Sequence, residues 1–413
     1  MTDLTSGPLP RIDITDPRFK ADPFPTYALL RAEAPVHPVP VPMFGTAYLV
    51  TRYDDVSAAF RDERLLKNRR TALTPEQFAR ARRIPAALAP LERNLLALDG
   101  GDHDRLRALV RTAFTPRRIQ SMREQASLLA DQLLDAALAK AERHGRFDLI
   151  ADYALPLPLT LIARILGVPE RDNARFSAWT TNLLALGRGN PLLRVPSVLM
   201  FLRYLRRLIA ERTTRPADDL VSALAAAREA DDALSADEVL SMIVLLLTAG
   251  HETTVNLIGT GALALLQHPD QLALLRNTDD RAAVGTAVEE LVRYVVPAET
   301  ATERFAREDL TIAGTPIPRG ALVLNVIASA NRDPAHFTDP ERLDLTRRPN
   351  KHLSFGQGAH YCLGASLSRL DAEVALPALL RRVPGLQLAV PVEQLRWRGG
   401  LILRGMASLP VRC

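Results

Sequence analysis

One of the two cysteines in this 413-residue chain lies among glycines at the start of a predicted helix. The decapeptide Phe355–Gly364 (FGQGAHYCLG) places three glycines around Cys362, and a helical pattern follows at Ala365–Arg382. Glycines let a backbone adopt positive φ angles and approach a flat ligand, and a helix N-terminus favours the thiolate form of a nearby sulfur. A lone buried cysteine is usually a small hydrophobic residue, but this spacing favours a thiolate beside a ligand.

A second segment whose residues could take part in catalysis is Ala249–Thr254 (AGHETT), which lies inside a long helical pattern. A glycine in a helix interior costs about 1 kcal/mol relative to alanine, and small residues there would leave room for a diatomic ligand. An acid beside an alcohol, here Glu252 and Thr253, can relay protons from solvent. The alternative is that Thr253 bonds back to its own helix while Glu252 forms an ordinary ion pair. His251 is expected to be structural.

These two segments resemble the signature motifs of the cytochrome P450 family. Phe355–Gly364 is similar at every defined position to the haem-binding loop F-G-x-G-x-H/R-x-C-x-G, and Ala249–Thr253 is similar to the oxygen-activation motif A/G-G-x-D/E-T. Further features (DHDRLR, AFTPRR, ANRDP and SLP) follow in the expected order over nearly the whole chain. The resemblance implies one domain over residues 1–413, mainly α with small β-sheets, with haem between a long central helix and the cysteine-bearing loop.

The resemblance also implies roles for individual residues. Cys362 would be the axial ligand of the iron of haem b, with Phe355 and Gly356 beside it, and thiolate ligation favours cleavage of the O–O bond of O2. Thr253 would assist oxygen activation and Glu252 would deliver protons. Further positions match cofactor-binding residues of the family, with Ala249 and Gly250 on the oxygen side and possible partners of the propionates at His103, Arg107, Arg304, His352 and His360.

For any single one of these cations, the alternative is a surface charge worth well under about 1 kcal/mol. A third motif, Glu290–Arg293, places an acid and a base on one helix face and resembles the E-x-x-R pair of the family. Arg342, in the segment DPER, is expected to complete this structural ion cluster.

The elements that would position these residues are mostly helical. Ser235 and Glu238 form a predicted capping box for a helix that runs to Gln267, about 31 residues and roughly 46 Å long. Apolar residues at three- and four-residue spacing predict helices at Leu128–Ala141, Val198–Ile209 and Ala282–Tyr294. Predicted strands are Ala47–Thr51, Leu310–Ile312, Ala321–Val326 and Leu401–Leu403.

Prolines mark three places of interest. The proline-rich stretches at 35–42 and 154–158 are predicted to be local turns. Pro377 lies inside the helix that follows Cys362, and it should kink that helix or end it early.

The predicted substrate region is mostly apolar. It comprises Leu95, Leu96, Leu245, Ala249, Thr300, Ile402 and Leu403. Such a pocket indicates a hydrophobic small molecule, for example a fatty acid, terpenoid, steroid or polyketide. The segment 67–93 is rich in arginine and is either a solvated basic loop or, as a hypothesis, the part that recognises a substrate carboxylate or an acidic carrier protein.

Composition limits the other function classes. The chain has 47% hydrophobic and 24% charged residues and a formal net charge of +5 that comes from scattered arginines, so nucleic-acid binding is not expected. Two cysteines indicate a reducing compartment. No signal region and no apolar run near 20 residues is apparent, so we expect a cytoplasmic, monomeric protein without a membrane anchor.

The chain shows no flavin, nicotinamide or iron–sulfur motif. Electrons from NAD(P)H would therefore arrive indirectly, through a reductase and a separate ferredoxin or flavodoxin. Arg117, Arg118, Arg347 and Arg348 are candidate docking residues. The function implied by the resemblance is a haem-thiolate monooxygenase that uses O2 as co-substrate. The alternatives are a peroxygenase driven by hydrogen peroxide, and a non-enzymatic haem sensor or carrier.

Overall fold

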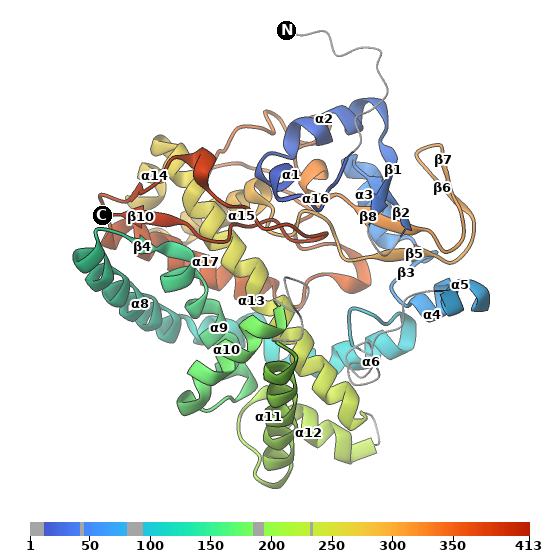
Figure 1. Cartoon of the computed structure of the whole chain (residues 1–413), viewed down its shortest axis with the longest axis horizontal. Helices are drawn as coiled ribbons and strands as arrows, with labels where there is room; N and C mark the ends of the chain where they lie inside the picture. Colours follow the sequence, from blue (N-terminus) through green and yellow to red (C-terminus); the bar gives the residue numbers. More distant parts are fainter. Residues whose placement is uncertain (1–11, 42–44, 81–93, 185–193, 232–233) are drawn as a thin grey trace.

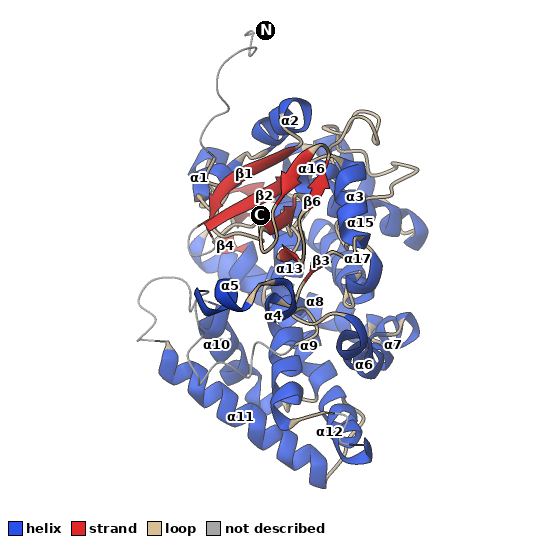
Figure 2. Ribbon diagram, turned by 90° about the vertical axis from the view of Figure 1, so that its right-hand side faces the viewer, coloured by secondary structure: helices blue, strands red, loops and turns tan. Residues whose placement is uncertain are grey.

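The computed structural model describes residues 12–41, 45–80, 94–184, 194–231 and 234–413. A helical body makes up most of the molecule, and the strands of the main sheet gather at one end of it, near α1, α2, α3 and α16, while β4 and β10 lie apart from them near α8 (Figure 1, Figure 2). The helices are α1 Pro17–Ala21, α2 Phe24–Glu33, α3 Tyr53–Arg61, α4 Arg69–Ala72, α5 Pro75–Arg80, α6 Gly100–Arg111, α7 Pro116–Ser121, α8 Arg123–His144, α9 Pro156–Leu166, α10 Asn173–Leu184, α11 Val195–Thr214, α12 Leu220–Asp231, α13 Ala236–Gln267, α14 Pro269–Arg276, α15 Arg281–Val295, α16 Ile327–Ala330 and α17 Ala365–Arg382. The strands are β1 Val36–Val41, β2 Gly45–Val50, β3 Leu65–Leu66, β4 Phe147–Asp148, β5 Arg304–Ala306, β6 Leu310–Ile312, β7 Thr315–Ile317, β8 Leu322–Asn325, β9 Gln387–Leu388 and β10 Pro410–Arg412.

Helix α13 is the axis of the helical body (Figure 1). Its capping box is formed as predicted, because the Ser235 hydroxyl accepts from the Glu238 N–H and the Glu238 carboxylate accepts from the Ser235 N–H. By length and composition this helix could cross a membrane, so the expectation that every apolar segment is too short was wrong. However, 72% of its most apolar window is buried inside the protein. Contacts with α9, α15 and α17 account for that apolar surface.

Helix α17, which follows Cys362, packs against α8 and α13. The prediction that Pro377 ends this helix early was wrong, because the helix continues to Arg382 with Pro377 buried inside it. A proline removes one backbone hydrogen bond. The buried positions on both sides of Pro377, from Leu370 to Leu380, explain why packing outweighs that loss.

The main sheet has the order β1-β2-β8-β5-β3, with β2 parallel to β8 and the other pairs antiparallel. The stretch 35–42 was predicted to be a turn, but Val36–Val41 forms the edge strand β1. An edge strand tolerates proline because one side of it needs no N–H donors. The sheet also positions charged residues, since β5 carries Arg304 and its neighbour β3 leads directly into Lys67.

Two other local predictions need correction. The stretch 154–158 is not a turn, because a π-helical segment Ile150–Ala154 leads into α9, which begins at Pro156; proline is tolerated in the first helical turn because its missing N–H has no partner there. Leu401–Leu403 is not a strand, and it forms only an isolated bridge between Leu403 and Ala298. The predicted strands near Ala47, Leu310 and Ala321 are confirmed as β2, β6 and β8.

Candidate active site

The loop before α17 exposes Cys362. The Cys362 N–H donates to the Phe355 carbonyl at 2.8 Å, and the Gly356 N–H donates to the Leu353 carbonyl at 2.8 Å. Gly356 and Gly358 adopt φ angles of +69° and +72°, which side chains other than glycine rarely adopt. The glycines therefore fold the loop back on itself and bring Cys362 to the start of the helix.

The surroundings of Cys362 affect the pKa of its thiol in opposite directions. Protein atoms packed around the sulfur raise the pKa of the thiol by desolvation, although the residue is exposed. The Gly364 N–H and the guanidinium groups of Arg369 and Arg107 lower the pKa. A cation bound at the sulfur would strongly favour the thiolate, as metals do for coordinated thiols.

Four of the five predicted propionate partners converge at this loop. The rings of His103, on α6, and His360 have centroids 4.3 Å apart. Arg107, one turn further along α6, donates to the Tyr361 carbonyl at 2.6 Å. Arg304 is buried, and its guanidinium donates to the Leu65 and Phe60 carbonyls at 2.9 and 3.2 Å. Arg304 belongs to the same charged group. Desolvation is the main cause that lowers the pKa of His360, and the positive charge of Arg304 lowers it as well.

This charged group fits the carboxylates of a haem. Asp99 lies 3.6 Å from His360 Nε2 and also acts on Arg304, and Asp104 lies 3.1 Å from His103 Nδ1. The Nε2 atom of His103 and the Nε atom of Arg304 are buried without a hydrogen-bond partner. The Nε–H of Arg304 is a buried donor that a bound carboxylate would satisfy, and the Nε2 atom of His103 is a second buried polar atom that a ligand would contact.

His352, the fifth predicted propionate partner, lies in a different cluster. Its Nε2 atom is 3.0 Å from Glu289 of α15, which also accepts from Arg369 at 3.1 Å. Desolvation raises the pKa of Glu289, but the hydrogen bonds from His352 and Arg369 outweigh it and lower the pKa to about 2. The Arg369 guanidinium lies 4.3 Å from the centre of the Phe355 ring. This cluster supports the cysteine loop.

The middle of α13 is open along one stripe. Ala249 is exposed and Leu245 and Thr253, one turn before and after it, are partly exposed on an otherwise buried helix. Gly250 lies on another side, because a Cβ there would meet Ile162 of α9 at 3.6 Å. The Thr254 hydroxyl, next to the stripe, is 3.3 Å from that of Ser368, so this part of α13 contacts α17, the helix that follows Cys362.

The acid and the alcohol of α13 both have protein partners. The Thr253 hydroxyl donates to the Ala249 carbonyl at 3.2 Å, and Glu252 forms an ion pair with Arg398 at 3.0 Å. These are the contacts of the structural alternative, and they also hold both groups in fixed positions beside the stripe. His251 is buried, bonds to the Leu247 carbonyl, and has its pKa lowered by desolvation, in agreement with a structural role.

The E-x-x-R pair is fully buried. Arg293 donates to Glu290 at 2.7 and 2.8 Å and to the carbonyls of Asn331, Pro340 and Arg342. Only the backbone of Arg342 takes part, and its side chain is exposed, so the expectation that Arg342 completes the ion cluster was wrong. Arg347 fills that position, with its Nε atom 3.1 Å from Glu290. The candidate docking role of Arg347 is therefore replaced by a structural one.

The predicted substrate residues are only partly brought together. The Thr300 hydroxyl and N–H donate to the carbonyls of Leu401 and Ile402 at 3.0 and 3.3 Å, and Leu403 bridges Ala298. Leu95 is buried in the main hydrophobic core, and Leu96 is partly buried. Residues 81–93 of the predicted basic loop, including Arg82 and Arg83, lie outside the described residues.

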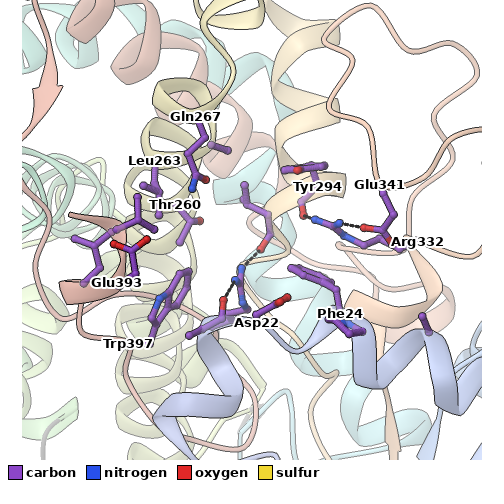
Figure 3. A pocket seen from close by; sticks show the side chains of 18 residues that line it. Asp22, Phe24, Thr260, Leu263, Gln267, Tyr294, Arg332, Glu341, Glu393 and Trp397 are labelled. Atoms are coloured by element: carbon purple, nitrogen blue, oxygen red, sulfur yellow. Dashed lines mark hydrogen bonds and ion pairs between the residues drawn. The ribbon is translucent and has the colours of Figure 1, made fainter. Parts of the chain in front are cut away.

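A cavity of about 690 Å³ lies elsewhere, between α1, α2, the C-terminal half of α13 and Trp397 (Figure 3). Its wall carries Arg332 stacked between Phe24 and Tyr294, with the guanidinium carbon 3.6 and 4.4 Å from the two ring centres. Neither Cys362 nor the open stripe of α13 lines it. This cavity is separate from the predicted site.

Sequence reasoning missed several residues that the structure brings to the site. Asp99, Arg369 and Arg398 carry no motif that marks them in a single sequence. Lys67 was grouped with the basic loop, although it is buried beside Arg304. Of the remaining docking candidates, Arg117 is exposed, Arg118 pairs with Asp218 at 2.9 Å, and Arg348 donates to Thr286.

Comparisons with known proteins agree with this geometry. A family model described as Cytochrome P450 matches residues 198–384. The cytochrome P450 monooxygenase PikC of Streptomyces venezuelae is 43% identical over 395 residues, which are 95% of this chain and 92% of PikC. The structure of the Bacillus subtilis 168 bacillaene polyketide synthase cytochrome P450 PksS is 38% identical, has a TM-score of 0.87, and is covered to 99% by 97% of this chain.

A third similar structure is that of P450BioI in complex with an acyl carrier protein ligated to hexadec-9Z-enoic acid, at 36% identity and a TM-score of 0.82. The match covers 96% of this chain and 99% of that one. The identities of 36 to 43% extend over nearly the full length of all three relatives. The chain therefore belongs to the cytochrome P450 family, and it is an oxidoreductase of the monooxygenase type.

Proposed function

We propose that this chain is a haem-thiolate monooxygenase that inserts one oxygen atom of O2 into a hydrophobic acyl or polyketide-like molecule. The observation that carries the proposal is the arrangement around Cys362. Its loop lies against the cation group of His103, Arg107, Arg304 and His360, and α17 contacts α13 beside its open stripe. One flat cofactor with two carboxylates would satisfy all of these features together.

The residues then have distinct tasks. Cys362 would bind the haem iron, and the haem would supply the oxidising chemistry while the protein supplies ligation, orientation and protons. The cation group would hold the propionates. Ala249 leaves space above the cofactor because its side chain is small and faces the open stripe.

The proton path would run along α13. Arg398 holds Glu252 at the buried side of the helix, and Thr253 is the next residue on the open stripe. A carboxylate and a neighbouring hydroxyl would form a relay for general acid catalysis. His251 would contribute no proton near neutral pH, because its desolvated ring is neutral there.

The substrate class is supported by the relatives and by the apolar lining. PksS belongs to a polyketide synthase system, and P450BioI was solved with an acyl chain on its carrier protein. Leu96 and Leu245 are partly exposed apolar residues that would contribute to the substrate region, with Thr300 and Ile402, whereas Leu95 would support it from the core. We propose a cytoplasmic, monomeric protein, one domain over residues 1–413, that receives electrons from a separate ferredoxin or flavodoxin.

An oxygen-labelling experiment tests the reaction, and an optical titration identifies the substrate. Ferric protein is titrated with free fatty acids, acyl carrier proteins loaded with the same chains, and macrolactones, and a shift toward high spin reports displacement of water from the iron. The best binder is then turned over with labelled O2 and a surrogate redox system. Incorporation of one labelled atom supports the proposal, whereas label from water or turnover only with peroxide contradicts it.

A further inference from the structure

Lys67 is a buried lysine at the edge of the proposed cofactor site. It follows β3, and only 7% of its surface is exposed. Its ammonium group donates to the Thr302 carbonyl at 2.7 Å and also to the Thr302 hydroxyl. Both partners are neutral, so the hydrogen bonds hold the ammonium group in place without balancing its charge.

The charged groups that face Lys67 come from three directions. Arg304 and Glu303 come from β5 and the segment before it, Asp99 comes from the residue before α6, and His360 comes from the cysteine loop. Asp99 already accepts from the N–H groups of Lys67 and Asn68 at 2.9 and 2.8 Å and lies 3.6 Å from His360. Asp99 thus serves backbone donors and His360, while the ammonium group of Lys67 contacts the neutral oxygens of Thr302.

The electrostatics of the chain alone point the same way. Burial, and then the positive charge of Arg304, lower the pKa of Lys67 to about 7, although Glu303 and Asp99 act in the opposite direction. A buried lysine in this situation either loses its proton or gains an anionic partner.

From this geometry we infer that Lys67 is a further cofactor-binding residue, whose ammonium group pairs with a carboxylate of the haem. The inference rests on the proposed haem site. It adds a fifth cation to His103, Arg107, Arg304 and His360, and none of the sequence motifs marks it.

A substrate carboxylate is the other possible partner of the same chemistry. The cofactor is favoured because Lys67 acts electrostatically on Arg304 and His360, which are themselves assigned to the propionates. The pairing has a structural consequence. The Asp99 carboxylate, just before α6, accepts from the backbone N–H groups of Lys67 and Asn68. Lys67 would therefore link the cofactor to the two positions, 67 and 99, between which Leu95 and Leu96 lie in the sequence.

The test is the rate at which haem leaves the ferric holoprotein for an excess of apomyoglobin at pH 7. Loss of a hydrogen bond to a charged group predicts that K67M releases haem about tenfold faster than the wild type. K67R keeps the charge and should restore most of the retention. R64M removes the same charge from an exposed residue just before β3, and it should release haem at the wild-type rate.

The pH dependence provides a readout that a purely structural role would not give. A bound carboxylate raises the pKa of Lys67 above its value of about 7 in the chain without haem. The contribution of Lys67 to haem retention is therefore complete below pH 7 and is lost as the pH rises through the raised value. Wild-type and K67M rates should converge as the pH increases.

Two outcomes would overturn the inference. One is an unchanged haem-transfer rate in K67M, together with weaker binding of a fatty acid but not of the corresponding alcohol, which would assign Lys67 to the substrate. The other is an equal acceleration in K67M and K67R that does not vary with pH, which would indicate a packing defect. If the wild-type holoprotein lacked thiolate-ligated haem, the proposed function would fail first, independently of any variant.

Discussion

At the scale of single residues, the site is a set of groups whose positions are fixed by unremarkable contacts. Thr253 bonds to its own helix and Glu252 forms an ion pair, which are the contacts expected of structural residues. Their distinguishing feature is location, because Thr253 lies on the open stripe of α13 and Glu252 directly precedes it on the buried side. The proposed function of these two residues therefore depends on their place at the open stripe of α13, and not on an unusual contact.

The alcohol of Thr253 can be removed with little cost to the fold. T253A loses one hydrogen bond on a partly exposed face, and the helix backbone does not depend on it. Because the hydroxyl is proposed to guide protons, we expect the variant to consume NADPH at a similar rate while forming less product and releasing hydrogen peroxide. The ratio of product to NADPH measures this, and T253S should recover most of the coupling. Full coupling in T253A would assign Thr253 a structural role only.

Glu289 provides a prediction of pH dependence. Its pKa is lowered to about 2 from an ordinary value of 4.5, and a shift of that size corresponds to about 3 kcal/mol at most, less with solvent screening. A lowered pKa in the folded state means that the stability is present above pH 4.5 and is lost as the pH falls toward 2. E289Q should therefore unfold at lower denaturant concentration at pH 6, and its difference from the wild type should shrink at pH 3. A pH-independent difference would contradict this account.

At the scale of elements, strong local patterns predicted the structure well. The helix from Ser235 to Gln267 was predicted with nearly correct boundaries because a capping box marks its start, and the helix Ala365–Arg382 was predicted from its helical sequence pattern. Prolines were less informative. The edge position of β1 and the buried surroundings of Pro377 are tertiary features, and local sequence does not contain them.

The ion cluster around Glu290 allows the contributions of Arg342 and Arg347 to stability to be compared. Arg347 pairs with the buried Glu290, whereas the side chain of Arg342 is exposed and only its carbonyl is used. Removal of one partner of a buried ion pair costs about 3 kcal/mol. R347M should therefore lower the free energy of unfolding by about that amount, and R342M should change it by less than about 0.5 kcal/mol. Denaturant titration of both variants measures this, and equal effects would restore Arg342 to the cluster.

At the scale of the whole molecule, the family, the helical architecture and the cysteine loop could be predicted from the sequence. The contacts that complete the site could not. Lys67, Asp99 and Arg398 meet the motifs only after the sheet and the C-terminal segment have folded against α6 and α13. His352 shows the converse, because a histidine near the motif packs against Glu289 and away from the other predicted cations.

The surface suggests how electrons would reach the site. Arg117 is exposed near the N-terminus of α7, and α7 contacts α17, the helix that follows Cys362. Electrostatic docking of an acidic ferredoxin there would weaken as salt screens the charges. We expect R117E to slow reduction of the haem at low salt and to make little difference at high salt. Stopped-flow reduction measures this, and a salt-independent rate in the wild type would argue against docking at this face.

The central claim is that Cys362 supplies a thiolate to the haem iron. The most direct measurement is the absorption spectrum of the dithionite-reduced, CO-bound protein, compared between the wild type and C362H. The account predicts the strongly red-shifted Soret band of thiolate-ligated haem in the wild type, and the shorter-wavelength band of histidine-ligated haem in C362H. A red-shifted band that survives in C362H, or its absence from haem-loaded wild type, would contradict it.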